Sequence, residues 1–188
     1  MTRVTRLRVK LRRARRRVRK FTRKISHRPL RGYHRARAKA VRQVRYLRYL
    51  SRKREAQVGQ MSPNFHVREF ACKDGSRVPE YAYPALRQLC QTYLEPLRER
   101  FGAIHVTSGF RHQAYNARIG GASLSLHRYE LHRDAVAADV VCATGTPGEW
   151  AAFLEGLSPG GLCPYPSSNF VHVDNRQRVG MASARWGA

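Results

Sequence analysis

Two short stretches of the sequence, residues 120–140 and 170–174, hold histidine and aspartate side chains of the kind that bind metal ions. The candidate ligands are His127, His132, Asp139, His172 and Asp174. Imidazole nitrogens and carboxylate oxygens form catalytic zinc sites, in which three protein ligands leave a fourth position open for water. Such a zinc ion polarises a carbonyl group and lowers the pKa of its water to about 7. The set therefore indicates a zinc hydrolase centre.

Asp139 and His172 are the strongest candidates because each lies within an apolar segment. Asp139 belongs to the run AVAADVVC, and a carboxylate buried among such residues is costly unless it is paired or binds a cation. His172 belongs to the run FVHVD, in which Phe170, His172 and Asp174 share one face of a strand. This alternation directs His172 and Asp174 into one cleft.

The rest of the sequence supplies the elements that must position these residues. In chain order we predict first a helix over 84–101, in which Pro96 causes a kink or marks the last turns and which Gly102 ends. A strand over 103–108, a brief helix through Tyr115 and Asn116, and a buried strand over 135–142 follow. The remaining elements are a helix begun by Thr146 that covers 150–157, a loop over 158–168, and a strand over 169–174 paired with 178–186. This order of helices and strands predicts an α+β fold.

Positive charge is concentrated in the first sixty residues. Residues 1–60 hold 24 of the 37 Lys and Arg and one of the 12 Asp and Glu, a net charge of +23, whereas residues 61–188 hold 13 basic and 11 acidic side chains, a net charge of +2. We therefore predict an Arg-rich, helical or partly disordered segment over 1–56, a linker over 57–63 and the metal-binding domain over 64–188.

The basic segment predicts two helices joined at residues 27–32. The first carries a narrow apolar stripe, and the second, over 33–56, has one apolar side. The stripe residues are Val4, Leu7, Leu11, Ala14, Val18, Phe21 and Ile25, followed by Ala40, Val44 and Leu47. Because so little apolar surface cannot offset like-charge repulsion, we expect an anionic partner, a membrane surface or self-association. Nucleic acid, lipopolysaccharide and teichoic acid all fit, and a solvated tail without a ligand is the alternative.

The start of the chain has no apolar run long enough for a signal peptide or a transmembrane segment. We therefore expect synthesis in the cytoplasm without a signal peptide. The cysteines, Cys72, Cys90, Cys142 and Cys163, form no CxxC pair and are expected to be buried free thiols.

Five motifs follow one another in an order found in one family of zinc peptidases. They are SGFR at 108–111, YN at 115–116, GGASLSLH at 120–127, AVAADV at 135–140 and FVHVD at 170–174. In this order they resemble the D-Ala-D-Ala carboxypeptidase family of the LAS group, which includes phage endolysins and the Hedgehog fold. The resemblance covers about residues 63–186. It implies a small mixed α+β domain with a central antiparallel sheet flanked by helices, Zn²⁺ held by His, Asp and His, and cleavage of peptidoglycan peptides next to D-amino acids.

The resemblance also implies residues that bind or orient the substrate. Arg111 matches an arginine that helps to bind the substrate, and a guanidinium suits a carboxylate. Ser125 matches a serine two residues before the first zinc ligand and is expected to orient it. Tyr115 and Asn116 are further candidates for substrate binding.

The family motif leaves the first zinc ligand open, while Asp139 and His172 match the second and third. The motif resembles S-x-H-x-x-G-x-A-x-D, with seven positions from histidine to aspartate. Counting forward from the preceding serine selects His127, twelve positions before Asp139, whereas counting back seven selects His132. We expect His127, with residues 128–134 as an inserted excursion, and keep His132 as the alternative.

The general base is a second departure from the family pattern. Some relatives place a glutamate three residues before the last histidine, where this sequence has Asn169, and the position two before it is Phe170. Asp174 lies two residues after His172. It either accepts a proton from the zinc-bound water or orients His172, and the sequence leaves both roles open.

Together these observations predict a zinc metallopeptidase, either carboxypeptidase or endopeptidase, that acts on peptidoglycan at the bacterial cell wall. The basic segment would concentrate it on an anionic surface, as suits a phage lysin or virion component. The alternative is a catalytically degenerate peptidase-fold protein that serves as a structural or binding module, with its basic segment on nucleic acid.

Overall fold

The computed structural model describes residues 3–25 and 31–186 and divides the chain into two compact units, Met1–Val58 and Gly59–Ala188. In chain order the elements are α1 (Arg3–Ile25), α2 (Arg31–Gly59), η1 (Val67–Phe70), η2 (Glu80–Ala82), α3 (Tyr83–Leu89), η3 (Cys90–Leu94), α4 (Glu95–Phe101), β1 (Ile104–Ser108), α5 (Gln113–Arg118), α6 (Tyr129–His132), β2 (Ala137–Cys142), α7 (Pro147–Glu155), β3 (Gly161–Tyr165), η4 (Pro166–Ser168), β4 (Phe170–Asp174), η5 (Arg176–Val179) and β5 (Ala184–Arg185). Among the described helices, none has a stretch apolar and long enough to cross a membrane.

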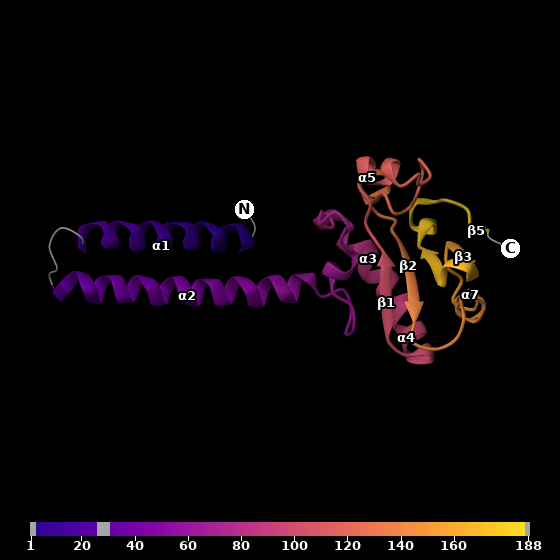
Figure 1. Cartoon of the computed structure of the whole chain (residues 1–188), viewed down its shortest axis with the longest axis horizontal. Helices are drawn as coiled ribbons and strands as arrows, with labels where there is room; N and C mark the ends of the chain where they lie inside the picture. The colour runs from indigo at the N-terminus through magenta and orange to yellow at the C-terminus, as the bar shows by residue number, and fades with distance from the viewer. Residues whose placement is uncertain (1–2, 26–30, 187–188) are drawn as a thin grey trace. The chain divides into compact units, whose positions relative to one another are not determined.

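The first unit is a hairpin of the two basic helices α1 and α2, which run antiparallel side by side (Figure 1). Ala14 of α1 and Ala40 and Leu47 of α2 are buried, and the Arg37 Nε donates a hydrogen bond of 3.5 Å to the Thr22 Oγ1 across the pair. Both predicted helices are confirmed. Their predicted joint, residues 27–32, falls largely on residues 26–30, outside the described part of the chain.

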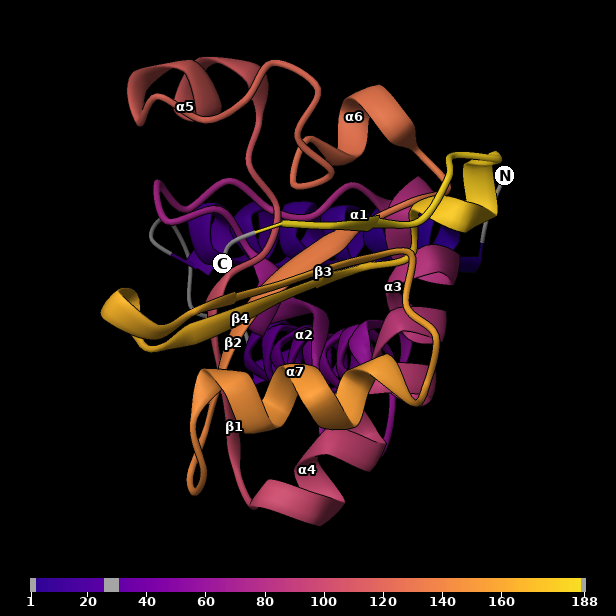
Figure 2. The ribbon, with the colours of Figure 1, turned by 90° about the vertical axis from the view of Figure 1, so that its right-hand side faces the viewer.

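The second unit is built on a five-stranded sheet with the order β1-β2-β4-β3-β5. Neighbours among β1, β2, β4 and β3 are antiparallel, and the two-residue strand β5 pairs with β3 in parallel. Figure 2 shows α4 and α7 on one side of this sheet and α5 and α6 on the other. The predicted α+β class with central antiparallel strands is confirmed.

Alternation along β2 and β4 separates an apolar face of the sheet from a polar one. Ala138, Val140, Val171 and Val173 belong to the main core beneath the helices. Asp139 and His172 therefore point to the opposite face, and the register sets them directly opposite each other on neighbouring strands. The predicted alternation of residues 170–174 is confirmed, and it decides where the polar side chains meet.

The helix predicted over 84–101 is interrupted rather than continuous. A π-helical turn, η3, lies between α3 and α4, and Pro96 follows it in the first turn of α4. Proline has no N–H group to donate and its ring clashes with the carbonyl four residues earlier, so the wider turn accommodates it. The helix ends at Gly102, whose φ of 81° is readily adopted only by glycine.

The start of α7 follows its sequence signature. The Thr146 side chain accepts a hydrogen bond from the Glu149 N–H, and the Glu149 carboxylate accepts one of 2.8 Å from the Thr146 N–H. This capping box holds the helix so that Trp150 and Leu154 are buried against the sheet.

The predictions for the last part of the chain were wrong in two places. Residues 158–168, predicted as a loop, contain the internal strand β3, whose glycine and proline are typical of turns and conceal it. Residues 178–186 do not pair with β4, because β2 and β3 already occupy both of its edges. Only Ala184–Arg185 forms a strand there, and it pairs with β3.

Residues 57–63, predicted as a linker, comprise the end of α2 and a turn of the second unit. Met61 and Ser62 in this turn are buried, and the Met61 N–H donates to the Phe65 carbonyl at 2.9 Å. The four cysteines are free and buried, as predicted.

Candidate metal centre

Three side chains converge on the face of the sheet that lies opposite the apolar core. Asp139 comes from β2, His172 from β4 and His127 from the loop before α6. The His127 Nε2 lies 3.1 Å from the Asp139 Oδ1, the His172 Nδ1 lies 2.8 Å from the same oxygen, and the two ring nitrogens are 3.3 Å apart. The residues are only 3%, 6% and 7% exposed for His127, Asp139 and His172.

The outer nitrogen of each imidazole faces a hydrogen-bond acceptor. The His127 Nδ1 lies 2.7 Å from the Gly109 carbonyl oxygen, and the His172 Nε2 lies 3.2 Å from the Asp174 Oδ2. Because a carbonyl and a carboxylate only accept, each outer nitrogen carries the proton when the ring is neutral. The inner nitrogens then present lone pairs to the Asp139 Oδ1, so three acceptors face one another.

A divalent cation bound between these three acceptor atoms would accept their lone pairs. In a tetrahedral zinc site with bonds of about 2.0–2.1 Å, neighbouring ligand atoms lie about 3.3–3.4 Å apart. The distances of 3.1 and 3.3 Å are close to this value, and the His172–Asp139 distance of 2.8 Å is shorter. His127, Asp139 and His172 could therefore hold a metal ion, and their imidazole and carboxylate ligands suit zinc.

The cluster lowers the pKa values of Asp139 and His127 and raises that of His172. Burial raises the pKa of Asp139, but His127 and His172 outweigh it and hold that pKa well below its usual range. Burial dominates at His127 and lowers its pKa, so this ring is neutral at pH 7. At His172 burial also lowers the pKa, but Asp139 and Asp174 overcome it and the net shift is upward.

The SGFR turn holds His127 at both its ring and its backbone. Gly109 provides the carbonyl for the ring, and the Arg111 N–H donates to the His127 carbonyl at 2.8 Å. Phe110 next to Gly109 donates its N–H to the Phe70 carbonyl at 2.8 Å. A Cβ on Gly109 would lie 2.6 Å from the Phe70 backbone, so only glycine permits this approach.

Arg111 binds the outer oxygen of the central carboxylate. Its Nη2 donates to the Asp139 Oδ2 at 2.7 Å, and its Nε donates to the Ser108 Oγ at 2.8 Å. A β-bulge between Val106 and Ser108 brings Ser108 beside Asp139 in the register of β1 and β2. Arg111 thus fixes the orientation of Asp139 and leaves its Oδ1 directed at the imidazoles.

Asp174 lies behind His172, on the far side of the ring from Asp139. Its side chain is fully buried, and Arg176 pairs with it through Nη2 at 2.6 Å and Nε at 3.0 Å. Burial raises the pKa of Asp174, but its hydrogen bonds with His172 and Arg176 hold that pKa below its usual range. Glycine at 161 makes room, since a Cβ there would lie 2.1 Å from the Asp174 Oδ2.

A comparison with protein families matches residues 63–174 to the peptidase M15 model. The chain belongs to the peptidase M15 family. This is a family of zinc-dependent peptidases, and the expected resemblance to D-Ala-D-Ala carboxypeptidases is confirmed for this domain. No curated protein matches the chain.

Within the M15 domain the structure brings His127, and not His132, together with Asp139 and His172. The His132 Nε2 instead lies 3.1 Å from the Leu124 carbonyl oxygen. His127 is followed by α6, which ends at His132, so the extra residues between the first histidine and β2 form a helical excursion. For this reason the spacing from His127 to Asp139 is longer than the spacing from histidine to aspartate in the family motif.

Ser125, Tyr115 and Asn116 lie around the loop that precedes His127. The His127 N–H donates to the Ser125 Oγ at 3.3 Å. Asn116 is buried and its Nδ2 donates to the carbonyls of Gly121 and Ala122, each at 3.0 Å, so it shapes the turn. The half-buried Tyr115 carries the Arg118 guanidinium over its ring at 5.0 Å.

Three further residues of the M15 domain were not anticipated from the sequence. Gly109 acts through its carbonyl, for which no side-chain pattern exists. Arg176 could have been sought, because a buried carboxylate such as that of Asp174 requires a paired charge or a cation. Trp186 lies with its ring 5.1 Å from the His172 ring and under the Arg176 guanidinium at 5.0 Å. It follows β5, whose pairing with β3 was not predicted.

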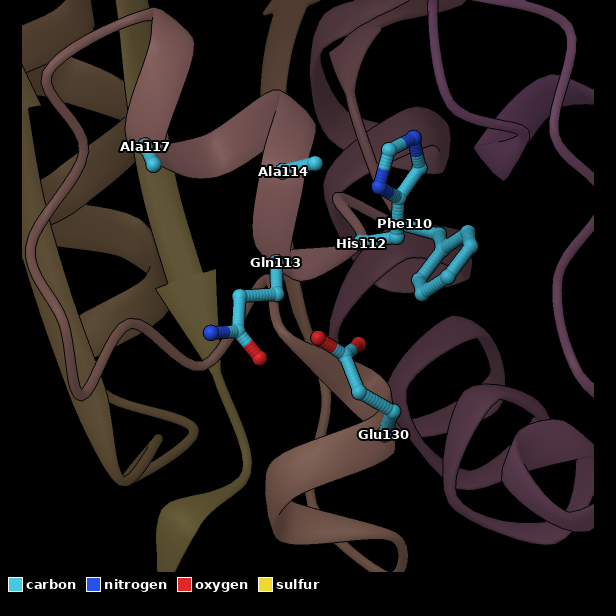
Figure 3. A pocket seen from close by; sticks show the side chains of 6 residues that line it. All are labelled: Phe110, His112, Gln113, Ala114, Ala117 and Glu130. Carbon is cyan, nitrogen blue, oxygen red and sulfur yellow. The ribbon is translucent and has the colours of Figure 1, made fainter.

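A shallow pocket of about 580 Å³ adjoins the SGFR turn and α5. Its lining residues are Phe110, His112, Gln113, Ala114, Ala117 and Glu130, and Figure 3 shows the Gln113 and Glu130 side chains turned toward each other. Arg128 lies near both, with its Nε 3.3 Å from the Glu130 Oε1 and its Nη2 3.4 Å from the Gln113 Oε1. The lining includes none of the three converging residues, so the pocket is separate from the candidate metal centre.

Proposed function

We propose that this M15 protein is a zinc peptidase that cleaves peptidoglycan stem or cross-bridge peptides next to D-amino acids. The observation that carries the proposal is the pair of imidazoles whose outer nitrogens are fixed by Gly109 and Asp174, so that their inner nitrogens face the Asp139 Oδ1. Membership of the zinc-dependent M15 family supports it. The peptidoglycan substrate follows from the D-Ala-D-Ala carboxypeptidase resemblance.

The residues of the centre divide into ligands and the groups that position them. His127, Asp139 and His172 would hold zinc, which supplies Lewis-acid polarisation of the scissile carbonyl and activation of a water molecule. Arg111 keeps Asp139 turned toward the imidazoles. The Arg111 side chain is 17% exposed, and its guanidinium is the group we propose to meet a carboxylate of the substrate.

For Asp174 we propose the positioning role rather than that of the general base. Its carboxylate accepts hydrogen bonds from His172 and Arg176 and has no exposed surface. A general base must reach the proton that it removes, whereas Asp174 contacts the outer nitrogen of His172. A buried carboxylate in this place fixes the tautomer and the orientation of a ligating imidazole.

The same geometry favours one alternative function. Among the described residues of the centre, both carboxylates are engaged, Asp139 with Arg111 and Asp174 with Arg176. A centre whose two carboxylates are both engaged in this way suits a catalytically degenerate M15 fold that binds wall peptides without cutting them. This alternative predicts metal binding without hydrolysis.

The decisive experiment compares metal content and peptide release for the full-length protein and two histidine variants. The wild type is expected to bind zinc at this centre and to release new peptide termini from purified muropeptides, detected by mass spectrometry. His127→Ala should lose this zinc and the release together, whereas the matched control His132→Ala should retain both. Equal losses in the two variants would contradict the assignment of the centre.

The products separate the remaining possibilities. Loss of a C-terminal D-amino acid identifies a carboxypeptidase, and cleavage within the stem or cross-bridge identifies an endopeptidase. Zinc retained by the wild type, with no cleavage of any muropeptide and with measurable muropeptide binding, would support the binding module and overturn the peptidase.

We propose further that the basic hairpin of α1 and α2 binds an anionic polymer and so concentrates the enzyme at its site of action, the bacterial cell wall, as in a phage lysin or virion component. The arginines described on α2 are exposed, and Tyr46 and Tyr49 among them are 61% and 58% exposed. Arginine neutralises phosphates and exposed aromatic rings can stack on bases. Salt titrations of full-length protein against DNA, lipopolysaccharide and teichoic acid would rank the polymers, and salt-independent binding to all three would contradict the proposal.

A further inference from the structure

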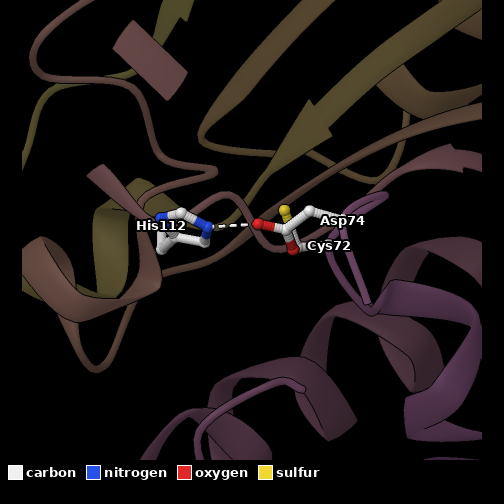
Figure 4. Close-up of side chains that lie close together, drawn as sticks. All are labelled: Cys72, Asp74 and His112. Carbon is white, nitrogen blue, oxygen red and sulfur yellow. Dashed lines mark hydrogen bonds and ion pairs between the residues drawn. The ribbon is translucent and has the colours of Figure 1, made fainter. Parts of the chain in front are cut away.

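We propose that Cys72, Asp74 and His112 form a second metal site, a structural one that takes zinc or a similar thiophilic divalent cation. One ligand atom from each residue lies within 4.8 Å of the others. Figure 4 shows the Asp74 carboxylate paired with the His112 ring and the Cys72 sulfur beside them. Cys72 is buried, whereas Asp74 is exposed, so the cluster lies at the surface of the M15 domain with its sulfur on the inner side.

The backbone holds Cys72 and Asp74 on one tight turn. The Cys72 N–H donates to the Ser76 carbonyl at 2.9 Å, and the Gly75 N–H donates to the Cys72 carbonyl at 2.9 Å. The Ser76 N–H donates to the Asp74 Oδ1, also at 2.9 Å. Gly75 has a φ of 90°, which suits glycine and closes the turn. Two ligands are thus preorganised before any ion arrives, and His112 approaches them from the start of α5.

The donor set selects the kind of ion. A thiolate, an imidazole and a carboxylate suit zinc, cobalt or a similar ion, whereas magnesium and calcium prefer oxygen ligands. Three protein ligands leave one tetrahedral position for water. The set also differs chemically from His127, Asp139 and His172, which offer no sulfur, and this difference allows the two sites to be told apart in one protein.

Binding at this site exchanges the hydrogen bond between His112 and Asp74, together with a weak one at the start of α5, for metal bonds. The His112 Nδ1 accepts the Tyr115 N–H at 3.3 Å and so caps α5. An ion on the His112 Nε2 moves the ring proton to Nδ1 and removes this acceptor. A hydrogen bond of that length is weak, and zinc bonds to thiolate and imidazole are much stronger. The Cys72 thiol releases its proton when the ion binds.

The site would fasten one side of the candidate metal centre. Cys72 lies two residues after Phe70, whose carbonyl accepts the Phe110 N–H, and His112 lies two residues after Phe110. An ion shared by Cys72 and His112 would therefore tie together the segments on either side of this hydrogen bond. Gly109 and Arg111, which hold His127 and Asp139, belong to the fastened segment.

Zinc stoichiometry of the full-length protein tests the proposal. The wild type should bind two zinc ions per chain, one at each centre. His112→Asn should bind one, because asparagine preserves the cap of α5 but lacks the imidazole, and Cys72→Ser should also bind one. The matched control is Cys90→Ser, another buried free cysteine, which should still bind two.

Cobalt substitution provides a readout specific to the second site. Cobalt bound by Cys72 should give a sulfur-to-cobalt charge-transfer band, which His112→Asn and Cys72→Ser lose and which His127→Ala retains. Failure of the proposed peptidase centre would remove the His127-dependent ion and leave this band in place. Absence of the band in the wild type, or unchanged stoichiometry in His112→Asn, would overturn the second site and leave a metal-free hydrogen-bonded cluster.

Discussion

The two units of the chain carry their charges in opposite ways. In the M15 domain the two carboxylates of the centre are buried and each has a partner of opposite sign at a defined distance, Arg111 for Asp139 and Arg176 for Asp174. In the basic hairpin the described arginines and lysines of α1 and α2 are exposed, and the only acidic residue in the first sixty is Glu55. The paired charges of the M15 domain fix the positions of individual side chains, whereas the exposed charges of the hairpin together produce a positive electrostatic potential.

This difference determines how strongly a single substitution should act. Removing one partner of a buried pair leaves an uncompensated charge in a medium that solvates it poorly. Removing one exposed arginine from a surface with many others changes the total electrostatic potential of that surface by only a small fraction. We therefore expect large local effects in the M15 domain and graded, additive effects in the hairpin.

Asp174→Asn should have the largest effect among these tests. The change leaves Arg176 without its anion and weakens the acceptor that orients His172. We expect zinc affinity to fall about 10–100-fold and the free energy of unfolding of the metal-free protein to fall by about 3 kcal/mol. Competition titration with a zinc indicator and urea unfolding measure the two effects.

The matched control is the exposed pair of Arg185 and Glu155, whose nitrogen and oxygen are 2.6 Å apart. Glu155→Gln should change neither zinc affinity nor unfolding appreciably, because exposed ion pairs are screened by water and salt. Equal effects of the two substitutions would remove the distinction between buried and exposed charge on which the comparison depends.

The contribution of Asp174 should also depend on pH with a defined sign. Its folded pKa lies below the unfolded value of about 3.9. Its stabilisation is therefore fully present above that unfolded value and is lost as the pH falls through the folded pKa. In the metal-free protein the stability difference between wild type and Asp174→Asn should stay constant from about pH 8 to 5 and shrink below about pH 4. Urea unfolding across this range measures it, and a difference that instead grows as the pH falls from 8 to 6 would assign the effect to His172, whose pKa Asp174 helps to raise.

The sequence was sufficient for the parts of the centre that depend on local pattern. The alternation in FVHVD predicted that His172 and Asp174 share a face, and the apolar setting of Asp139 indicated a partner or an ion. Both predictions depend only on the residues next to each side chain in the sequence. The same holds for the capping box at Thr146 and the end of the helix at Gly102.

The parts that the sequence did not reveal depend on contacts between distant segments. Strand β3 contains Gly161 and Pro164, which are typical of turns. Only the fold shows that the missing side chain of Gly161 leaves space for the Asp174 carboxylate on the neighbouring strand. The Gly109 carbonyl has no signature in a side-chain pattern. Whether His127 or His132 approaches Asp139 depended on the path of residues 128–134, which α6 decides.

Gly161→Ala should have an intermediate effect by displacing the same buried pair without removing a charge. The new Cβ would lie 2.1 Å from the Asp174 Oδ2, so the carboxylate or β3 must move. We expect a loss of unfolding free energy of about 1–3 kcal/mol, with weaker zinc binding. Gly148→Ala in α7 is the control, because its Cβ would meet nothing within 4 Å. A neutral Gly161→Ala would show that the pair tolerates displacement and is less specific than we infer.

The smallest effect is expected from a single charge in the hairpin. Arg45→Gln removes one exposed guanidinium, and it should lower the slope of log affinity against log salt for DNA by about 1 while leaving peptide cleavage unchanged. Neutralising Arg42, Arg45 and Arg48 together should lower the slope by about 3, because independent phosphate contacts add. Salt titrations of the full-length variants measure these slopes. A complete loss of binding from Arg45→Gln alone would show that the hairpin recognises its polymer through one defined contact, as the M15 domain holds its carboxylates.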